Sequence, residues 1–424
     1  MSPRQDVLMI LREGLRAVDP YLCLKNSLSI EDDILKIQNF ELNLDSFENV
    51  YVIGAGKATY NMARALEDSI LPRITEGHII IPRDSKSLKK ITSTKGSHPI
   101  PDENSLRGAK RILELAQKAS ERDLIFFLLS GGASALLTLP PAEINLQDLQ
   151  KLTDLLLKSG ADISEINTVR KHISKVKGGN LAKACYKAHV LTLIISDVRG
   201  DLLSVIGSGP TVLDESTISE VFEILERYNL KERIPISISK YLETQPETPK
   251  EPKYFRRVSN FVISNNLAFL KASKRKAENL GYNTFLEEKP ISGEARDVAR
   301  KLVLKAKKLK KKPTILIAGG ETTVTVKGEG IGGRNLELAL ASLSHIEKGM
   351  TLVSFATDGI DGLTDASGAF ADFETLKKAK DMNLRIGEFL KRNDSYNFFF
   401  RTGDLIRTGE TGTNVSDVVL VIVT

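Results

Sequence analysis

The 424-residue sequence contains no tryptophan, two cysteines and five histidines. Cys23 and Cys185 lie far apart in the sequence, which excludes a disulfide scaffold and a cysteine metal site and favours a reduced compartment, which we expect to be the cytoplasm. The histidines show neither the HxH nor the HExxH spacing of zinc enzymes. No GxSxG motif occurs either, which argues against an α/β-hydrolase.

Long apolar runs and a strong charge excess are also missing. No run approaches the roughly 18 apolar residues of a transmembrane helix, and we expect no membrane partner. Near the start of the sequence, Val7, Leu8, Leu11 and Leu15 follow helical spacing with charges between them, which predicts an amphipathic core helix and not a signal peptide. The net charge of +6 suggests anionic small molecules at least as readily as nucleic acid. No aromatic residues interleave with the lysines of 301–312, so we expect a solvated helix end there and no nucleic-acid site.

The sequence does contain a repeated order of apolar run, glycine-rich turn and helical pattern. The runs are VYVIG (50–54), DLIFFLLS (123–130) and HVLTLIIS (189–196). Uninterrupted apolar strands are usually buried on both faces, as in parallel sheets covered by helices. The pattern predicts an α/β fold with a Rossmann-like, doubly wound parallel sheet, in which ligands bind beyond the carboxyl ends of the strands.

The proline-rich, charged segment 243–257 predicts a linker between two domains. We expect an N-terminal domain over 1–242 and a smaller C-terminal α/β domain over 258–424, with a cleft between them. Within the second domain, the patterns predict a helix near 266–280, strands over 313–320 and 351–359, a helix over 333–343 and a closing strand over 418–423.

Glycine turns suggest phosphate chemistry, because they let several backbone N–H groups approach one anion closely. The sequence has six: GAGKA (54–58), SGGASA (130–135), KGGN (177–180), GSGP (207–210), GGET (319–322) and GIGGRN (330–335). A single glycine turn after a strand is common in α/β proteins. Six of them, several with Lys, Arg, Ser or Thr, favour a site that binds phosphate.

The first of these turns nearly matches two known motifs. A Walker A loop would need Gly at 51 and Ser or Thr at 58, where the chain has Tyr51 and Ala58. A dinucleotide-binding fingerprint is met at Gly54 and Gly56 but has Thr59 at its third position. What remains is Lys57 beyond a strand end, where its ammonium would meet a phosphate or a carboxylate, or would simply be a surface lysine.

Acids occupy similar positions. Asp197 follows one strand, and Asp358 and Asp361 follow another. A carboxylate at such a strand end holds Mg²⁺ or accepts a proton from a hydroxyl in a phosphate site, although Asp-Gly is also a common turn former. Arg334 opens a predicted helix after two glycines and would bind a carboxylate or a γ-phosphate with two hydrogen bonds, or be an ordinary first-turn residue.

Together these segments resemble the glycerate kinases of the MOFRL type, also called class II glycerate kinases. The resemblance covers nearly the whole chain. It rests on VIGAGKA (52–58), GSHPIPDENS (96–105), LLSGGASAL (128–136), NTVRKHISKVKGGNLA (167–182), SDVRGD with IGSGPT (206–211), GGETTVTVKGEGIGGRNLELAL (319–340), FATDGIDGLTDASGA (355–369) and TGTNVSDV (411–418). One departure is Glu410, where the family pattern has proline, and it affects only a loop.

The resemblance implies ATP-dependent phosphorylation of D-glycerate, at the 2-hydroxyl, with Mg²⁺ or another divalent cation and an active site in the cleft. It implies that Lys57 and Arg334 bind substrate and act in catalysis, and that Asp197 is the active-site acid. Asp197 and Asp358 are the metal-ligand candidates. The loops that would bind the nucleotide and its phosphates comprise Ser130, Gly131, Gly132, Ala133 and Ser134, and Lys177, Gly178, Gly179 and Asn180. Family habit suggests a homodimer.

Two other functions remain open at this point. An NAD(P)H-dependent hydroxypyruvate reductase would need the complete dinucleotide fingerprint that the sequence lacks. A non-catalytic sugar-phosphate-binding protein would need neither Asp197 nor Asp358. Which of the two cations faces which anion, and whether the product is 2- or 3-phosphoglycerate, do not follow from the sequence.

Overall fold

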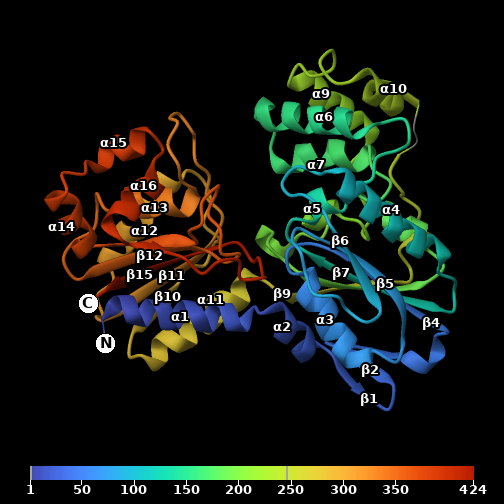
Figure 1. Cartoon of the computed structure of the whole chain (residues 1–424), viewed down its shortest axis with the longest axis horizontal. Coiled ribbons are helices and arrows are strands. Elements are labelled where there is room, and N and C mark those ends of the chain that lie inside the picture. Colours follow the sequence, from blue (N-terminus) through green and yellow to red (C-terminus); the bar gives the residue numbers. More distant parts are fainter. Residues whose placement is uncertain (1, 245–246) are drawn as a thin grey trace. The chain divides into compact units, whose positions relative to one another are not determined.

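Two six-stranded sheets organise the chain in the computed structural model, which describes residues 2–244 and 247–424 (Figure 1). Each sheet forms the centre of its own unit. Unit 2 is Pro20–Ile263, and unit 1 combines Met1–Asp19 with Ser264–Thr424. The predicted two-domain α/β fold is therefore confirmed.

Unit 2 contains the predicted parallel sheet. Its strand order is β6-β5-β4-β7-β8-β9, and every pair from β6 to β8 is parallel. The strands are β4 (Asn49–Ala55), β5 (Ile74–Ile81), β6 (Ile91–Lys95), β7 (Asp123–Ser130), β8 (His189–Ile195) and β9 (Val258–Ser264). All eight residues of β7 are buried, as its apolar sequence predicts. Helices α3 (Thr59–Ile70) and α4 (Glu103–Lys118) each follow a strand, as in a doubly wound sheet.

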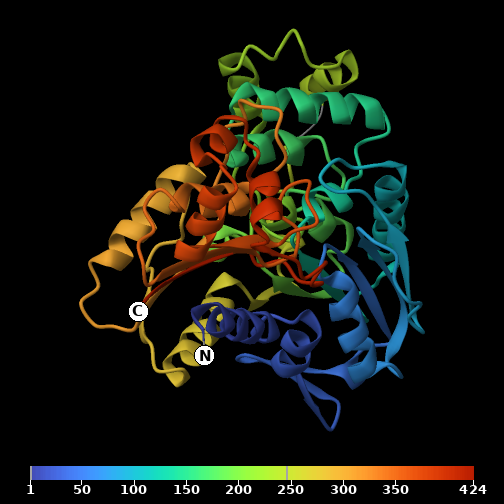
Figure 2. The same ribbon diagram turned by 60° about the vertical axis from the view of Figure 1, so that its left-hand side comes forward.

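Four helices form a separate layer of unit 2. They are α6 (Leu146–Ser159), α7 (Ile163–His172), α9 (Ile218–Arg227) and α10 (Ile236–Thr244). Their apolar faces share one core, which includes Leu152, Val169 and Val221. Figures 1 and 2 show this layer beyond the short helix α5 (Ala133–Leu136), on the far side of α5 from the parallel sheet. The remaining elements of unit 2 are α2 (Pro20–Ser27), α8 (Asn180–Ala184) and a small antiparallel sheet of β1 (Ser29–Glu31), β2 (Ile34–Ile37) and β3 (Phe40–Asn43).

Unit 1 has a mixed sheet of order β10-β11-β15-β12-β13-β14. Its strands are β10 (Asn283–Leu286), β11 (Thr314–Gly320), β12 (Met350–Ala356), β13 (Gly368–Asp372), β14 (Leu405–Ile406) and β15 (Asp417–Val423). The last strand, β15, lies between β11 and β12 and is antiparallel to both. Figure 1 shows α1 (Pro3–Ala17) and α11 (Asn266–Asn279) side by side on one face of this sheet, and α12 (Ala295–Lys307) and α13 (Arg334–Ser342) on the other. Unit 1 also contains the helices α14 (Phe373–Asp381), α15 (Ile386–Lys391) and α16 (Ser395–Thr402).

The structure divides the chain differently from the predicted ranges 1–242 and 258–424. The N-terminal helix α1 belongs to unit 1, because Arg4 binds Asp372 through Nε and Nη2 at 2.6 and 2.7 Å and Asp404 through Nη1 at 2.6 Å. Tyr282 donates a further hydrogen bond to the α1 residue Asp6 at 2.7 Å. Strand β9 belongs to the sheet of unit 2.

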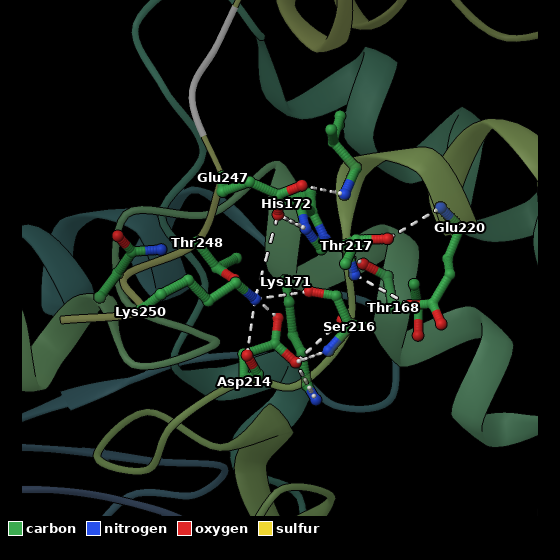
Figure 3. A network of polar contacts seen from close by, with 12 residues as sticks. Thr168, Lys171, His172, Asp214, Ser216, Thr217, Glu220, Glu247, Thr248 and Lys250 are labelled. Atoms are coloured by element: carbon green, nitrogen blue, oxygen red, sulfur yellow. Dashed lines mark hydrogen bonds and ion pairs between the residues drawn. The ribbon is translucent and has the colours of Figure 1, made fainter. Parts of the chain in front are cut away.

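The predicted linker 243–257 is also packed differently from a free connection, although 245–246 lie outside the described residues. Thr248 is buried, and the Lys250 ammonium donates to the backbone oxygens of Asp214 and Ser216 at 2.6 Å each (Figure 3). Lys250, one of the charges of the predicted linker, therefore satisfies backbone groups of unit 2.

Cys23 and Cys185 are buried and form no disulfide. Among the helices of the described residues, none is long and apolar enough to cross a membrane.

Candidate functional site

The three turns that follow β4, β7 and β8 lie along one edge of the unit 2 sheet. Strands β4, β7 and β8 are neighbours and parallel, with Ala55 opposite Leu129 and Ser130 opposite Ile195. Their carboxyl ends therefore share an edge, and Lys57, Gly131 and Asp197 each follow one of these ends. The strand order reverses between β4 and β7, and such a switch point is where α/β sheets commonly bind ligands.

The loops after β4 and β7 are tied together. The backbone N–H of Lys57 donates to the carbonyl of Gly131 at 2.9 Å. The Ser130 hydroxyl accepts from the N–H of Ala58 at 3.0 Å. Gly56 has φ +141°, and a Cβ atom there would lie 2.1 Å from Ser130 Oγ, so this close approach requires glycine. Ser130 thus fixes the backbone beside Lys57.

Gly132 brings a second group to this edge. Its φ is +85°, and a Cβ atom on it would lie 3.1 Å from His98 Cδ2 and 3.4 Å from Lys57 Cγ. The Lys57 side chain, the imidazole of His98 and the Gly131–Gly132 turn are therefore neighbours. Lys57 is half-buried, so it is not the freely solvated lysine of the alternative interpretation.

Thr59 takes the position of the third fingerprint glycine. Its Cγ2 would lie 2.7 Å from a Cβ on Gly54, and its hydroxyl lies 3.2 Å from Ser130 Oγ. A threonine here replaces the glycine that dinucleotide-binding folds use for close packing of helix on strand. This geometry weighs against the reductase alternative.

The loop 177–180 is fixed against the 207–210 turn. Gly178 and Gly179, with φ +54° and +79°, donate their N–H groups to the carbonyls of Ser208 and Gly209 at 3.0 and 2.8 Å. Asn180 donates its side-chain amide to the carbonyl of Lys177 at 3.0 Å. The Ser208 hydroxyl lies 3.2 Å from that of Ser134, which connects this loop to the turn after β7.

Lys177 itself is buried. Its ammonium donates to the carbonyl of Leu137 at 2.5 Å. Burial lowers the pKa of Lys177 to about 7, and the positive charge of Arg170 lowers it further in the same direction. An anion bound beside this group would raise its pKa, so the amine would take up a proton from water at neutral pH.

In unit 1, Arg334 begins α13 and is bound by two carboxylates. It donates from Nε and Nη2 to Asp417 at 2.5 and 3.2 Å, and from Nη1 to Glu321. These contacts use three of the five N–H donors of a guanidinium. Burial lowers the pKa of Arg334, but the charge and hydrogen bonds of Asp417 outweigh that effect, so the pKa is raised.

Asp417 is 3% exposed and begins β15, between the ends of β11 and β12. Burial raises its pKa to about 7, and Arg334 only partly offsets that rise. Asp417 therefore orients the Arg334 guanidinium at the cost of holding a carboxylate in a buried position.

The two acids of unit 1 that the sequence singled out, Asp358 and Asp361, make contacts that stabilise local structure. Asp361 accepts from the N–H groups of Asn335 and Leu336 at 3.0 and 2.8 Å, which caps the first turn of α13. Asp358 Oδ1 accepts from the N–H of Ile360 at 3.1 Å, as in a turn-forming aspartate. The turn-forming interpretation weighed for these residues thus has direct support.

Two family models match this chain: residues 6–243 match DUF4147, a domain of unknown function, and residues 314–417 match the MOFRL family. The glycerate 2-kinase of Pyrococcus horikoshii is 41% identical over 439 residues, covering 100% of this chain and 98% of that protein. The D-glycerate 2-kinase of Thermotoga maritima is 38% identical, covering 99% and 98%. The chain belongs to the MOFRL family of glycerate kinases.

Solved structures agree with this family. A crystal structure of glycerate kinase from Thermotoga maritima superposes with a TM-score of 0.84 at 36% identity, covering 99% of each chain. A crystal structure of a Pyrococcus horikoshii OT3 protein gives 0.82 at 41% identity, covering 100% of this chain and 99% of that one. The resemblance inferred from the sequence motifs is thereby confirmed.

In this family member, the predicted site residues fall in both matched ranges. Lys57, Asp197 and the two phosphate loops lie in the first range and in unit 2, whereas Arg334 and Asp358 lie in the second range and in unit 1. Within 2–244 and 247–424, no group of three or more His, Cys, Asp or Glu side chains could hold a metal ion.

The sequence interpretation missed three residues that act on the candidate site residues: Arg170, which lies near Lys177 in unit 2, and Glu321 and Asp417, which bind Arg334 in unit 1. Asp417 gives a local signal, since an acid directly precedes the apolar run of β15. Glu321 follows the strand-end glycines of β11, which is a weaker signal. Arg170 lies in the segment NTVRKHISKVKGGNLA, but as one of three adjacent basic residues it gives no local signal of its own.

Proposed function

We propose that this chain transfers the terminal phosphoryl group of ATP to the 2-hydroxyl of D-glycerate, giving 2-phosphoglycerate and ADP. The observation that carries the proposal is the similarity to proteins named glycerate 2-kinase over 98–100% of both chains. The strand-end loops of unit 2 support it, because phosphoryl transfer depends on positioning and charge neutralisation more than on covalent chemistry.

We assign the catalytic roles as follows. Asp197 orients the glycerate hydroxyl or accepts its proton, Lys57 binds phosphoryl or carboxylate charge beside the Gly131–Gly132 turn, and Arg334 binds the other of these charges with its remaining N–H donors. The Asp417 carboxylate acts as a positioning residue for Arg334, since it fixes the plane of the guanidinium. Ser130 positions Lys57 through the backbone of the adjoining loop.

A divalent cation is part of the proposal, with Asp197 and Asp358 as the candidate ligands. Mg²⁺ in nucleotide sites is usually held by one or two carboxylates together with phosphate oxygens and water. The described residues contain no group of three or more His, Cys, Asp or Glu side chains that could hold a metal ion, which fits a cation that arrives with the nucleotide better than a dedicated protein cage. Such a cation would neutralise charge on the phosphates of ATP.

The experiment is direct. The purified chain is incubated with ATP, Mg²⁺ and D-glycerate, ADP formation is followed, and the product is identified by ³¹P NMR. The 2-phosphoglycerate resonance is expected. A 3-phosphoglycerate resonance would refute the regiochemistry, and oxidation of NADH by hydroxypyruvate without ADP formation would favour the reductase.

We also propose that the protein is cytoplasmic, because neither of its two cysteines forms a disulfide, and that it forms a homodimer. Sedimentation at several concentrations tests the dimer.

A further inference from the structure

Three consecutive basic residues, Arg170, Lys171 and His172, end helix α7, and they differ in their partners. Lys171 binds the buried Asp214 at 3.0 Å, and the imidazole of His172 lies 3.3 Å from the carboxylate of Glu247 (Figure 3). Arg170 has no hydrogen-bond or ion-pair partner in the described parts of the chain, 2–244 and 247–424. Burial nevertheless lowers the pKa of Arg170, so this guanidinium is neither paired nor fully solvated.

Arg170 lines a pocket of about 200 Å³ that lies entirely within unit 2. Lys177 lines the same pocket, with the hydroxyls of Ser134 and Ser174 and an apolar wall that includes Leu149 and Leu157. His98 also lines it, and this residue lies beside Gly132 and Lys57. The pocket therefore adjoins the loops at the carboxyl edge of the parallel sheet.

The charges of this pocket are unbalanced. It is lined by two cationic side chains and by no Asp or Glu. Removing charges from water without a counter-ion is unfavourable, and burial accordingly lowers the pKa of both Arg170 and Lys177. An anionic ligand would supply the missing counter-charge. The neighbouring Lys171, by contrast, has a carboxylate partner within the protein, Asp214.

We propose that the Arg170–Lys177 pocket binds phosphate groups of the nucleotide, with the guanidinium and the ammonium as counter-charges and Ser134 and Ser174 as hydroxyl donors. This inference rests on the proposed function. Charge favours a nucleotide over glycerate, because the pocket can present two positive charges, that of Arg170 and, once it is protonated, that of Lys177, whereas a single carboxylate carries only one negative charge. The guanidinium fork also matches phosphate oxygens well.

The first test compares Arg170→Met with Lys175→Met in the full chain. Both changes remove one positive charge from the same part of unit 2, but Lys175 is exposed and does not line the pocket. We expect Arg170→Met to weaken ATP binding about 10- to 100-fold in titration calorimetry, as for loss of a charged hydrogen bond, and to leave the KM for D-glycerate within about twofold. Lys175→Met should bind ATP like the unchanged protein, and Arg170→Lys should be intermediate. Melting curves establish that each variant is folded.

A second readout follows the proton. The titratable groups that face the Lys177 ammonium are Arg170 from α7 and His98 from the loop before α4, while Asp214 beside Gly178 is paired with Lys171. Because burial and Arg170 hold the pKa of Lys177 at about 7, a phosphate dianion in the pocket should raise this pKa, and the amine should then take up a proton from the buffer. Calorimetry in two buffers of different ionisation enthalpy should show proton uptake on ATP binding near pH 7, and Lys177→Met should abolish this uptake.

The outcomes separate this inference from the proposed function. Unchanged ATP affinity in Arg170→Met, equal weakening in Lys175→Met, or a raised KM for glycerate alone would overturn the pocket assignment while kinase activity persists. Inorganic phosphate that binds in an Arg170-dependent manner without competing with ATP would overturn the nucleotide as its occupant. Arg170-dependent ATP binding in a chain that phosphorylates no glycerate would overturn the proposed function and leave the pocket assignment intact.

Discussion

Arg334→Ala, compared with the double variant that also carries Asp417→Asn, separates the proposed catalytic role of this arginine from its structural one. The change removes the partner of Asp417, which is 3% exposed and would keep a buried carboxylate without its counter-charge. Breaking a buried ion pair in this way costs about 3–5 kcal/mol. Because the Arg334 side chain is 35% exposed, we expect a smaller loss of about 2–3 kcal/mol, or roughly 4–12 °C in the melting temperature.

The loss should depend on pH. In the folded protein the pKa of Asp417 is raised to about 7, above its ordinary value of 3.8, so the folded state binds the proton more tightly than the unfolded state. The stability that Asp417 contributes is therefore complete below about pH 4 and is lost as the pH rises towards 7. Without Arg334 this pKa rises further, so the variant should melt close to the unchanged protein at pH 4 and well below it at pH 8.

The assay combines calorimetric melting between pH 4 and 8 with turnover at pH 7.5. Arg385→Ala is the matched control, because its partner Glu388 is 61% exposed and the pair contributes little. In the double variant, Asp417→Asn should restore most of the stability at pH 8 but not the turnover. Equal melting of Arg334→Ala and the unchanged protein at pH 8 would refute the buried-pair argument, and recovery of turnover in the double variant would show that Arg334 acts on structure alone.

Three further changes test other parts of the structure. Lys57→Met should lower turnover at least about 100-fold with an unchanged melting temperature, whereas the exposed Lys110→Met on α4 should have no effect; normal turnover in Lys57→Met would remove its catalytic role. Gly56→Ala should destabilise the protein by about 2–4 kcal/mol, measured by urea unfolding, because its Cβ would lie 2.1 Å from Ser130 Oγ at a φ of +141°; a loss below 1 kcal/mol would mean that the two loops separate easily. Arg4→Met should lower the melting temperature and speed hydrogen exchange in unit 1, since it leaves two buried carboxylates without their arginine; faster exchange confined to unit 2 would contradict the assignment of α1.

The parts of the fold that the sequence predicted are those encoded by neighbouring residues. The runs that became β4, β7 and β8 are largely apolar because nearly all of their residues are buried, and this shows directly in the sequence. The turns after them carry the glycines that their backbone requires, as at Gly56 and Gly132. Parallel neighbours then bring the turn residues to one edge, which is why Lys57 and the Gly131–Gly132 turn were identified together.

The parts that the sequence did not predict depend on residues far apart in the chain. The apolar run of β15 predicts a strand but does not predict that this strand lies between β11 and β12. The same run would suit any strand whose two faces are buried, whether it lies at the edge of the sheet or at its centre. The pairing of Arg334 with Asp417 spans 83 positions and exists only through that insertion. Likewise, α1 has the apolar stripe of any core helix, and nothing in that stripe shows that its partners, α11 and the carboxylates of Asp372 and Asp404, follow more than 250 residues later.

Lys57, which is placed by neighbouring residues, and Arg334, which is placed by distant ones, differ in what a substitution can reveal. Backbone hydrogen bonds to the turn after β7 fix the loop that carries Lys57, and Lys57→Met keeps them, so loss of turnover in that variant would report on the ammonium group. Arg334 is held by distant carboxylates, one of them buried, so its removal changes stability and chemistry together. A charged residue assigned from a sequence motif is therefore a safe target for a functional test only when its counter-charge is known, and at Arg334 the decisive measurement is the behaviour of the Asp417→Asn background.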